Sequence, residues 1–170
     1  MTPRLPSPAP GHADPMARSV LAHLPESLGH FQALYAALWQ SPHLDPVTKE
    51  IARVRNARLT GCGYCRNVRF EAPRAAGLTE ATLDLVADGY EASTLSPRHK
   101  AVLRFTDAFL TDPTSLTPTD HAELLTQLTP LEIIELTAAL ALFMGFSKIA
   151  VALGTAPDDM PLTVLPTPGS

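Results

Sequence analysis

The sequence contains very little cysteine, with two residues in a chain of 170. Two cysteines exclude the disulfide scaffold of small secreted domains, which needs several bridges. An excess of positive charge is also absent, since 13 Lys and Arg stand against 17 Asp and Glu and the formal net charge is −4. General binding to nucleic acid or to an anionic membrane would need a concentrated basic patch, and we expect neither partner.

Long hydrophobic runs are missing as well. The longest charge-free stretch in the most apolar region is the twelve residues Leu136–Ser147, whereas a membrane span needs roughly 20. The first fifteen residues contain Arg4, His12 and Asp14 and no apolar run like the core of a signal peptide. We therefore predict no transmembrane segment and a cytoplasmic protein. Hydrophobic residues still make up 45% of the chain, which is enough for a buried core and excludes general disorder.

Proline marks the ends of the chain and the starts of helices. Five of the 17 prolines lie within residues 1–15 and four within 157–170. We therefore predict an irregular N-terminal tail over 1–15, one helical domain over 16–155 and an irregular C-terminal tail over 156–170. Four other prolines each follow a residue that commonly caps helices, in Asp45-Pro46, Ser96-Pro97, Thr117-Pro118 and Thr129-Pro130.

The apolar residues between these signals recur at helical spacing, and sustained alternation is absent, so the predicted fold class is all-α. Thr129 and Glu132 have the spacing of a capping box. Gly77 is expected to end the helix that carries the cysteines, and Pro73 to kink or break it. The last helix is apolar on nearly every side, which predicts a central position or a subunit interface. The predicted helices cover residues 27–40, 46–60, 62–76, 79–88, 97–111, 118–128 and 130–153.

The two cysteines, Cys62 and Cys65, form a C-x-x-C pair. A zinc site needs three or four protein ligands, and the six histidines lack the H-x₃₋₅-H spacing, so we predict no metal. Two unreactive buried cysteines are a second alternative. Redox cycling is better supported, because nearby positive charge favours the reactive thiolate. Six of the 13 Lys and Arg residues lie between positions 53 and 74, at Arg53, Arg55, Arg58, Arg66, Arg69 and Arg74, against Glu71 alone.

The position of the pair adds to this interpretation. Both cysteines lie at the start of a predicted helix, where unpaired N–H groups favour a negative sulfur. The spacing of Cys62, Cys65 and Arg69 predicts that they share one helical face. A thioredoxin fold would require strands around the motif, whereas the predicted neighbours are helices on both sides.

These residues resemble a known family. Lys49-Glu50-Ile51-Ala52-Arg53, Leu59-Thr60-Gly61-Cys62-Gly63-Tyr64-Cys65 and Ala75-Ala76-Gly77-Leu78 look like the AhpD-like alkylhydroperoxidase branch of the carboxymuconolactone decarboxylase family. Matching features run from about residue 20 to 155, and a glutamate stands twelve positions before the first cysteine. The resemblance implies a compact helical domain of about six to seven helices and assembly as a trimer or hexamer. We also expect no cofactor.

The resemblance also implies a reaction. Cys65 would attack a small organic hydroperoxide, and Cys62 would resolve the resulting sulfenic acid as a disulfide. An external thiol or disulfide reductant would restore the dithiol. Glu50 matches the acidic member of the family's proton relay, and a carboxylate near a thiol can accept its proton.

Arg69 departs from the family pattern, which has a histidine at this position. Arginine stays charged and cannot relay a proton, although it can stabilise a thiolate. Solvent, Tyr64, His99 or His121 would then replace the histidine. Two alternative functions remain open: a decarboxylase of the broader family, whose branch does not use a C-x-x-C pair, and a redox-responsive binding protein without turnover.

Overall fold

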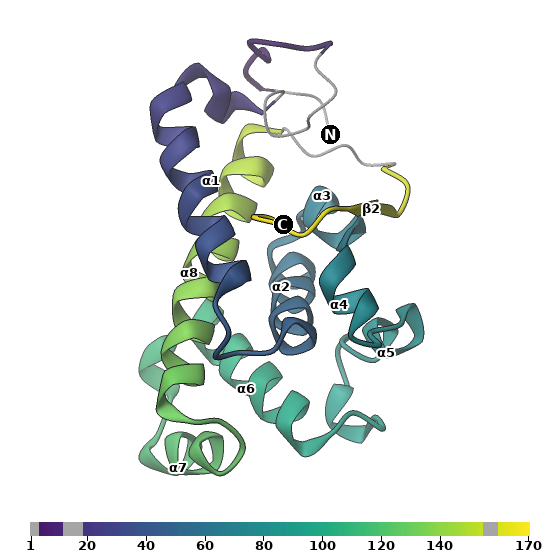
Figure 1. Ribbon diagram of the computed structural model, residues 1–170. Helices are drawn as coiled ribbons and strands as arrows, with labels where there is room; N and C mark the ends of the chain where they lie inside the picture. Colours follow the sequence, from purple (N-terminus) through teal and green to yellow (C-terminus); the bar gives the residue numbers. More distant parts are fainter. Residues whose placement is uncertain (1–3, 12–18, 155–159) are drawn as a thin grey trace.

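The computed structural model describes residues 4–11, 19–154 and 160–170. Eight α-helices in these ranges form the fold, so the all-α class is confirmed (Figure 1). The α-helices are α1 (Pro25–Gln40), α2 (Pro46–Thr60), α3 (Gly63–Asn67), α4 (Glu71–Ala75), α5 (Glu80–Asp84), α6 (Pro97–Thr111), α7 (Pro118–Gln127) and α8 (Pro130–Leu153). Two short strands, β1 (Val68–Phe70) and β2 (Thr163–Leu165), and the 3₁₀ turns η1 (Val20–His23), η2 (Tyr90–Ala92) and η3 (Pro113–Ser115) complete the described elements.

The helix starts at proline have the caps that the sequence predicts. Each residue before the proline accepts a hydrogen bond from the backbone N–H three residues later, which satisfies one of the free donors of the first turn. The predicted capping box of Thr129 and Glu132 is present. A second box joins Thr117 and Asp120. Local chemistry therefore fixes where α2, α6, α7 and α8 begin.

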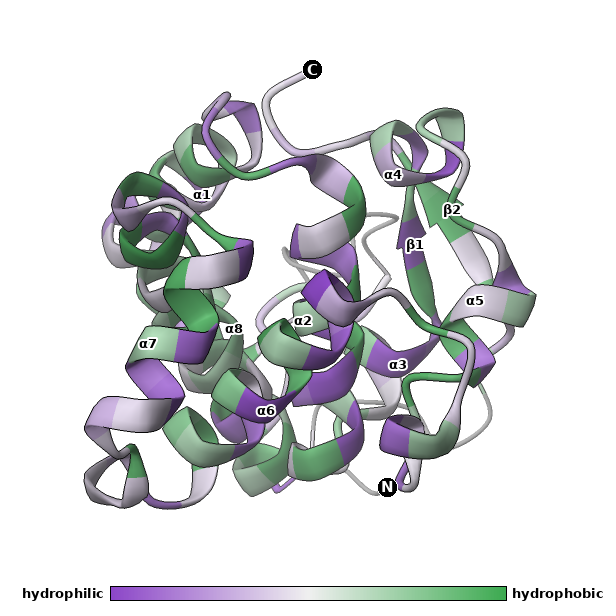
Figure 2. Ribbon diagram, turned by 90° about the horizontal axis from the view of Figure 1, so that it is seen from below, coloured by the Kyte–Doolittle hydropathy of each residue, from purple (hydrophilic) through white to green (hydrophobic). Residues whose placement is uncertain are grey.

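Helix α2 lies at the centre of the molecule. It packs against α6 and α8, and ten of its residues are buried. Figure 2 shows α2 near the middle of the view even though parts of its ribbon have the hydrophilic colour. The buried polar residues of this helix include Lys49, Glu50, Arg53 and Asn56, and each makes at least one side-chain hydrogen bond. A polar helix can occupy the core because its charges are paired.

Helix α8 is the other long core element. Among the described residues it is the one helix that is long and apolar enough to cross a membrane, by length and composition only. Core helices meet the same test, so the predicted absence of a transmembrane segment stays a prediction. Leu136, Leu140 and Phe143 from its inner face belong to the main hydrophobic core, together with Trp39 and Phe70. The helix packs against α1, α2 and α6, so its inner face forms part of the protein core.

The single helix predicted over 62–76 is wrong. The chain forms α3, then β1, then α4, and this interruption raises the helix number above the predicted six to seven. Pro73 explains the interruption, because it has no N–H to bond the carbonyl of residue 69. Pro73 is instead the third residue of α4, within the first turn, where the N–H groups need no helical partner. Gly77, with φ of 94°, follows the end of α4 as predicted.

The chain termini pack against this region and against α8. Strand β2 pairs in parallel with β1, with Arg69 opposite Val164, so the prediction of an irregular C-terminal tail is wrong over Thr163–Leu165. The backbone N–H of Arg4 donates to the carbonyl of Leu153 at the end of α8. Residues 1–3 and 12–15 of the predicted N-terminal tail, and 156–159 of the C-terminal one, lie outside the described residues. The predicted helix 79–88 is shorter, because α5 ends at Asp84.

Candidate active site

The two cysteines lie where α2 turns into α3. Gly61 ends α2 in the left-handed conformation, with φ of 70°, which glycine adopts at little cost. Cys62 then caps α3, and its sulfur accepts a hydrogen bond of 3.4 Å from the backbone N–H of Cys65. Both thiols are free and buried, with 0% of Cys62 and 7% of Cys65 exposed. The helix start predicted for the pair is thus confirmed, with Cys62 as the cap rather than the first helical residue.

Arg53 is the charged residue that contacts this turn. Arg53 is 2% exposed, and its guanidinium donates to the carbonyl oxygens of Cys65, at 2.7 Å, and Val68, at 2.6 Å. It also lies over the ring of Phe70, 5.1 Å from the ring centroid. In the sequence, Arg53 is one of six basic residues and the end of the Lys49–Arg53 segment, with no sign that it contacts the cysteines. In the structure it ties α2 to the backbone that carries the reactive pair.

Glu50 holds Arg53 in place. The carboxylate is fully buried, and its two oxygens accept hydrogen bonds of 2.8 and 2.6 Å from the Arg53 guanidinium. Within residues 4–11, 19–154 and 160–170, no hydrogen bond joins this carboxylate to either sulfur. Glu50 therefore contacts the cysteine turn through Arg53, and its predicted role as the acidic member of a proton relay, direct or through water, stays a prediction.

Two residues that the sequence analysis missed complete the surroundings of Cys65. The Ser147 hydroxyl, on α8, donates to the Cys65 sulfur at 3.4 Å and accepts from the side-chain amide of Asn56, on α2, at 2.9 Å. Both residues are fully buried. Ser147 stands more than eighty positions from the motif, and its one sequence signal is a polar residue in the most apolar helix.

The two thiols differ in acidity. The pKa of Cys62 falls to about 6, chiefly because the Cys65 thiol donates a hydrogen bond to it, with further help from the Cys65 N–H, Ser147 and Arg53 against the effect of burial. The pKa of Cys65 rises, because its thiol is the donor in that hydrogen bond and because it is buried. The pair titrates as a unit, in which Cys62 is the more acidic thiol.

Arg69 does not face the cysteines. Helix α3 ends at Asn67, so the shared helical face predicted for Cys62, Cys65 and Arg69 is wrong. The guanidinium of Arg69 instead pairs with Glu80 at 2.9 Å and donates to two backbone carbonyls of its own segment. The ion pair with Glu80 therefore links β1 to α5.

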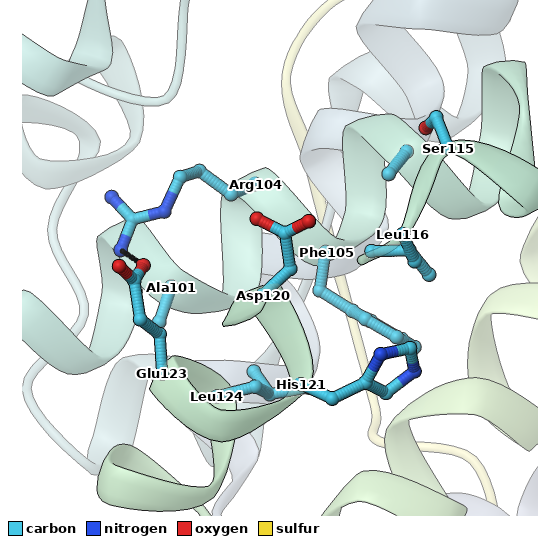
Figure 3. A pocket seen from close by; sticks show the side chains of 10 residues that line it. Ala101, Arg104, Phe105, Ser115, Leu116, Asp120, His121, Glu123 and Leu124 are labelled. Atoms are coloured by element: carbon cyan, nitrogen blue, oxygen red, sulfur yellow. Dashed lines mark ion pairs between the residues drawn. The ribbon is translucent and has the colours of Figure 1, made fainter. Parts of the chain in front are cut away.

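The other predicted relay groups lie in different places. Tyr64 is in the cysteine cluster, with its ring edge-on to Phe146 at 6.3 Å. His99 is close enough to Asp45 to be affected by its charge, and Asp45 caps the start of α2, whereas the cysteines follow its end. His121 lines a separate cavity of about 190 Å³ between α6 and α7, away from α3 (Figures 1 and 3). Neither histidine is placed to relay a proton at the cysteines.

No cluster of three or more potential metal ligands occurs in the part of the chain that the structure describes.

Comparisons with known proteins agree on the fold. The sequence profile of the carboxymuconolactone decarboxylase family matches residues 25–108, a range that includes Glu50, Cys62 and Cys65. Two uncharacterized proteins from Mycobacterium tuberculosis are 30% identical over 124 residues, which is 73% of this chain and 43% of theirs. The chain thus spans less than half the length of these relatives.

Solved structures with this fold come from several bacteria. An uncharacterized peroxidase-related protein from Ralstonia eutropha, described as an alkylhydroperoxidase AhpD core, has a TM-score of 0.74 at 23% identity over 85% of this chain and 77% of its own. A peroxidase-related protein from Silicibacter has a TM-score of 0.68 at 19% identity, over 79% and 71%. The debrominase Bmp8, solved with 2,3,4-tribromopyrrole, also scores 0.68, at 15% identity over 82% and 74%. The chain belongs to the carboxymuconolactone decarboxylase family and has its AhpD-like helical fold.

Proposed function

We propose that this protein is a dithiol oxidoreductase that reduces small organic hydroperoxides through a reversible Cys62–Cys65 disulfide. The observation that carries the proposal is the buried pair of free cysteines at the start of α3, where the Cys65 backbone N–H donates to the Cys62 sulfur at 3.4 Å. Two cysteines three residues apart at a helix start can form a disulfide with little backbone movement. The family and its peroxidase-related structural relatives support the same class of reaction.

In the proposed first step, Cys62 acts as the base for Cys65. The Cys62 thiolate takes the proton of the Cys65 thiol along their hydrogen bond, and Cys65 becomes the thiolate. Cys65 then attacks one peroxide oxygen and breaks the O–O bond, which leaves a sulfenic acid on Cys65 and an alkoxide. The alkoxide takes the proton from Cys62 and departs as the alcohol. This route needs no histidine at position 69.

In the second step the Cys62 thiolate attacks the sulfur of the Cys65 sulfenic acid. The S–S bond forms, and hydroxide leaves and is protonated by solvent. The two sulfurs have then given two electrons to the peroxide, and the products are one alcohol and one water. An external dithiol reductant returns two electrons and two protons through thiol–disulfide exchange.

Buried charge assists this chemistry. The positive charge of Arg53 lowers the pKa of both thiols, so it stabilises whichever sulfur is ionised. In this proposal the Glu50 carboxylate positions Arg53. Tyr64 packs against the cysteine cluster.

An apolar cavity next to the pair fits an organic substrate. Its volume is about 450 Å³, and its walls come from the ends of α2, α6 and α8. Val151 lines this cavity and also packs against the cysteine cluster. The remaining lining residues are Leu59, Thr60, Leu110, Thr111, Met144, Lys148 and Ala152.

The proposal includes a cellular setting. A dithiol that must be reduced after each turnover suits the cytoplasm, where thiol reductants are maintained. We further propose a homo-oligomer, as a trimer or hexamer, with no nucleic-acid or membrane partner and no cofactor.

Steady-state peroxide consumption tests the proposal. With tert-butyl hydroperoxide and excess dithiothreitol, the wild type should continue past one equivalent per chain, whereas Cys65→Ser should not. Consumption that stops after one equivalent would instead indicate a redox-responsive binding protein. No consumption, with both thiols still titratable, would exclude a peroxidase and leave the decarboxylase alternative, which decarboxylation of carboxymuconolactone tests directly.

A further inference from the structure

Ser147 and Asn56 form a short chain of hydrogen bonds that ends on the Cys65 sulfur. The Asn56 amide nitrogen donates to the Ser147 oxygen at 2.9 Å, and the Ser147 hydroxyl donates to the Cys65 sulfur at 3.4 Å. The first bond comes from α2 and the second from α8, the two helices with the most extensive mutual packing. The hydroxyl therefore sits at a fixed place between two rigid elements.

The Asn56 amide determines where the Ser147 proton points. A hydroxyl has one proton and accepts through its lone pairs. Because the Asn56 nitrogen occupies a lone pair of the Ser147 oxygen, the hydroxyl proton is directed elsewhere, and the Cys65 sulfur is its acceptor. The sulfur thus receives a donor that is already oriented.

The chemistry of Asn56 argues against a purely structural role. Asn56 is fully buried, and its side-chain oxygen has no hydrogen-bond partner among the described residues. A buried acceptor without a partner is destabilising, and buried polar groups of this kind call for an explanation. Residues that lower stability in this way concentrate at functional sites. Among the described residues, the Asn56 side chain makes one hydrogen bond, to Ser147, and Ser147 in turn contacts the Cys65 sulfur.

We propose that Ser147 is a further catalytic residue, whose hydroxyl stabilises the Cys65 thiolate, and that Asn56 is a positioning residue that turns this hydroxyl toward the sulfur. The inference rests on the proposed dithiol function. In the first step, charge moves from Cys62 to Cys65 as the proton moves the other way, and the hydrogen bond from Ser147 strengthens as that charge grows. Ser147 keeps its own proton throughout, which distinguishes it from a histidine relay.

The test measures the reactivity of Cys65 alone, without peroxide. In a Cys62→Ala background, Cys65 is the one remaining thiol, and its rate of alkylation by iodoacetamide reports its thiolate content. Ser147→Ala should slow alkylation about tenfold at neutral pH, a typical worth for one hydrogen bond to an ionised partner. The whole pH profile should move to higher pH, so that the two proteins react equally fast in strong base.

Thr137→Val is the matched control. Thr137 lies on the same helix, ten residues before Ser147 and therefore about 15 Å away. Its hydroxyl donates to a carbonyl of its own helix, so its removal reports the general effect of losing a hydroxyl from α8. The control should keep the parental pH profile. A profile of Ser147→Ala that matches the control would overturn the proposal.

A double-mutant cycle tests the link to Asn56. Asn56→Leu removes the amide at similar size and should shift the profile in the same direction as Ser147→Ala. In the Ser147→Ala background, Asn56→Leu should cause no further shift, because it acts through the missing hydroxyl. Additive shifts would overturn the positioning role. An unchanged Cys65 pKa in Ser147→Ala would also overturn it, because the Ser147 hydroxyl would then donate to Asn56 and not to the sulfur.

The readout separates this inference from the proposed function. Alkylation needs a thiolate and no peroxidase activity. If wild-type protein fails to consume hydroperoxide while Ser147→Ala still shifts the alkylation profile, the peroxidase proposal fails and the Ser147 inference stands. If hydroperoxide is consumed and the alkylation profile does not shift, the Ser147 inference fails and the peroxidase proposal stands.

Discussion

Replacement of Glu50 by glutamine separates two roles for this carboxylate. Glu50 is fully buried and pairs through both oxygens with Arg53, which is 2% exposed. Glu50→Gln leaves the guanidinium buried without its counter-charge. Removal of one partner of a buried ion pair typically costs about 3–5 kcal/mol of folding free energy. The midpoint of urea unfolding should therefore shift to a lower urea concentration, as this loss of folding free energy requires.

The effect on the thiols should have the opposite sign to the effect on stability. Arg53 lowers the pKa of both cysteines, and Glu50 partly neutralises that charge. Without Glu50 the pKa of each thiol should fall further, so thiolate content at neutral pH should not decrease. If Glu50 were the proton acceptor of the reaction, its loss would slow peroxide attack by about 10²–10⁴-fold. If Glu50 instead positions Arg53, the rate should stay within a few fold of wild type.

Glu135→Gln is the matched control for this experiment. Glu135 is also buried and pairs with buried Lys49 at 2.6 Å, and Lys49 donates to the carbonyls of Trp39 and Ser41 rather than to the cysteine turn. Both variants should lose similar stability in urea unfolding under reducing conditions. Rates of reaction with one equivalent of hydroperoxide are then compared without urea, at a temperature where both variants are folded. A drop of a hundredfold or more in Glu50→Gln, with Glu135→Gln unaffected, would refute the positioning role and restore Glu50 as the base.

Three further predictions concern the reactive pair and Arg69. Cys62→Ser should accumulate a trappable sulfenic acid on treatment with peroxide and Cys65→Ser should not; trapping in Cys65→Ser alone would make Cys62, the more acidic thiol, the attacking residue. The first thiolate of the reduced wild type should appear as pH rises through about 6, measured by ultraviolet absorbance, and a first midpoint near the ordinary thiol value of about 8.5 would contradict the hydrogen-bonded pair. Arg69→His removes the ion pair with partly exposed Glu80, so it should lower the free energy of unfolding by about 1 kcal/mol and leave the thiol reaction rate unchanged. A gain in turnover would show that the side chain at position 69 takes part in the reaction.

The sequence predicts best what local chemistry decides. A capping side chain followed by proline determines a helix start through atoms within three residues, and all four such starts are where the pattern puts them. The break between α3 and α4 was less predictable. Pro73 indicates a disruption, but the strand that fills the gap forms because β2, almost a hundred residues later, supplies a partner for β1.

The site is predictable only in its motif. The C-x-x-C spacing identifies Cys62 and Cys65, yet the side chains that tune them come from elsewhere. Arg53 is recognisable as the key cation only once α2 is known to be buried, since five other basic residues compete with it in the sequence. Ser147 and Asn56 meet through the packing of α8 on α2, which no local pattern encodes.

The intact mass and free-thiol count of the reduced protein after one equivalent of an organic hydroperoxide show directly whether Cys62 and Cys65 are a redox-active dithiol. A redox-active pair should lose two hydrogen atoms per chain, leave no free thiols, and recover both thiols fully on addition of dithiothreitol. Digestion should give a single cross-linked peptide that contains Cys62 and Cys65. Unchanged mass with two free thiols, or a mass gain from added oxygen without a disulfide, would contradict the claim that this buried pair is a redox-active dithiol.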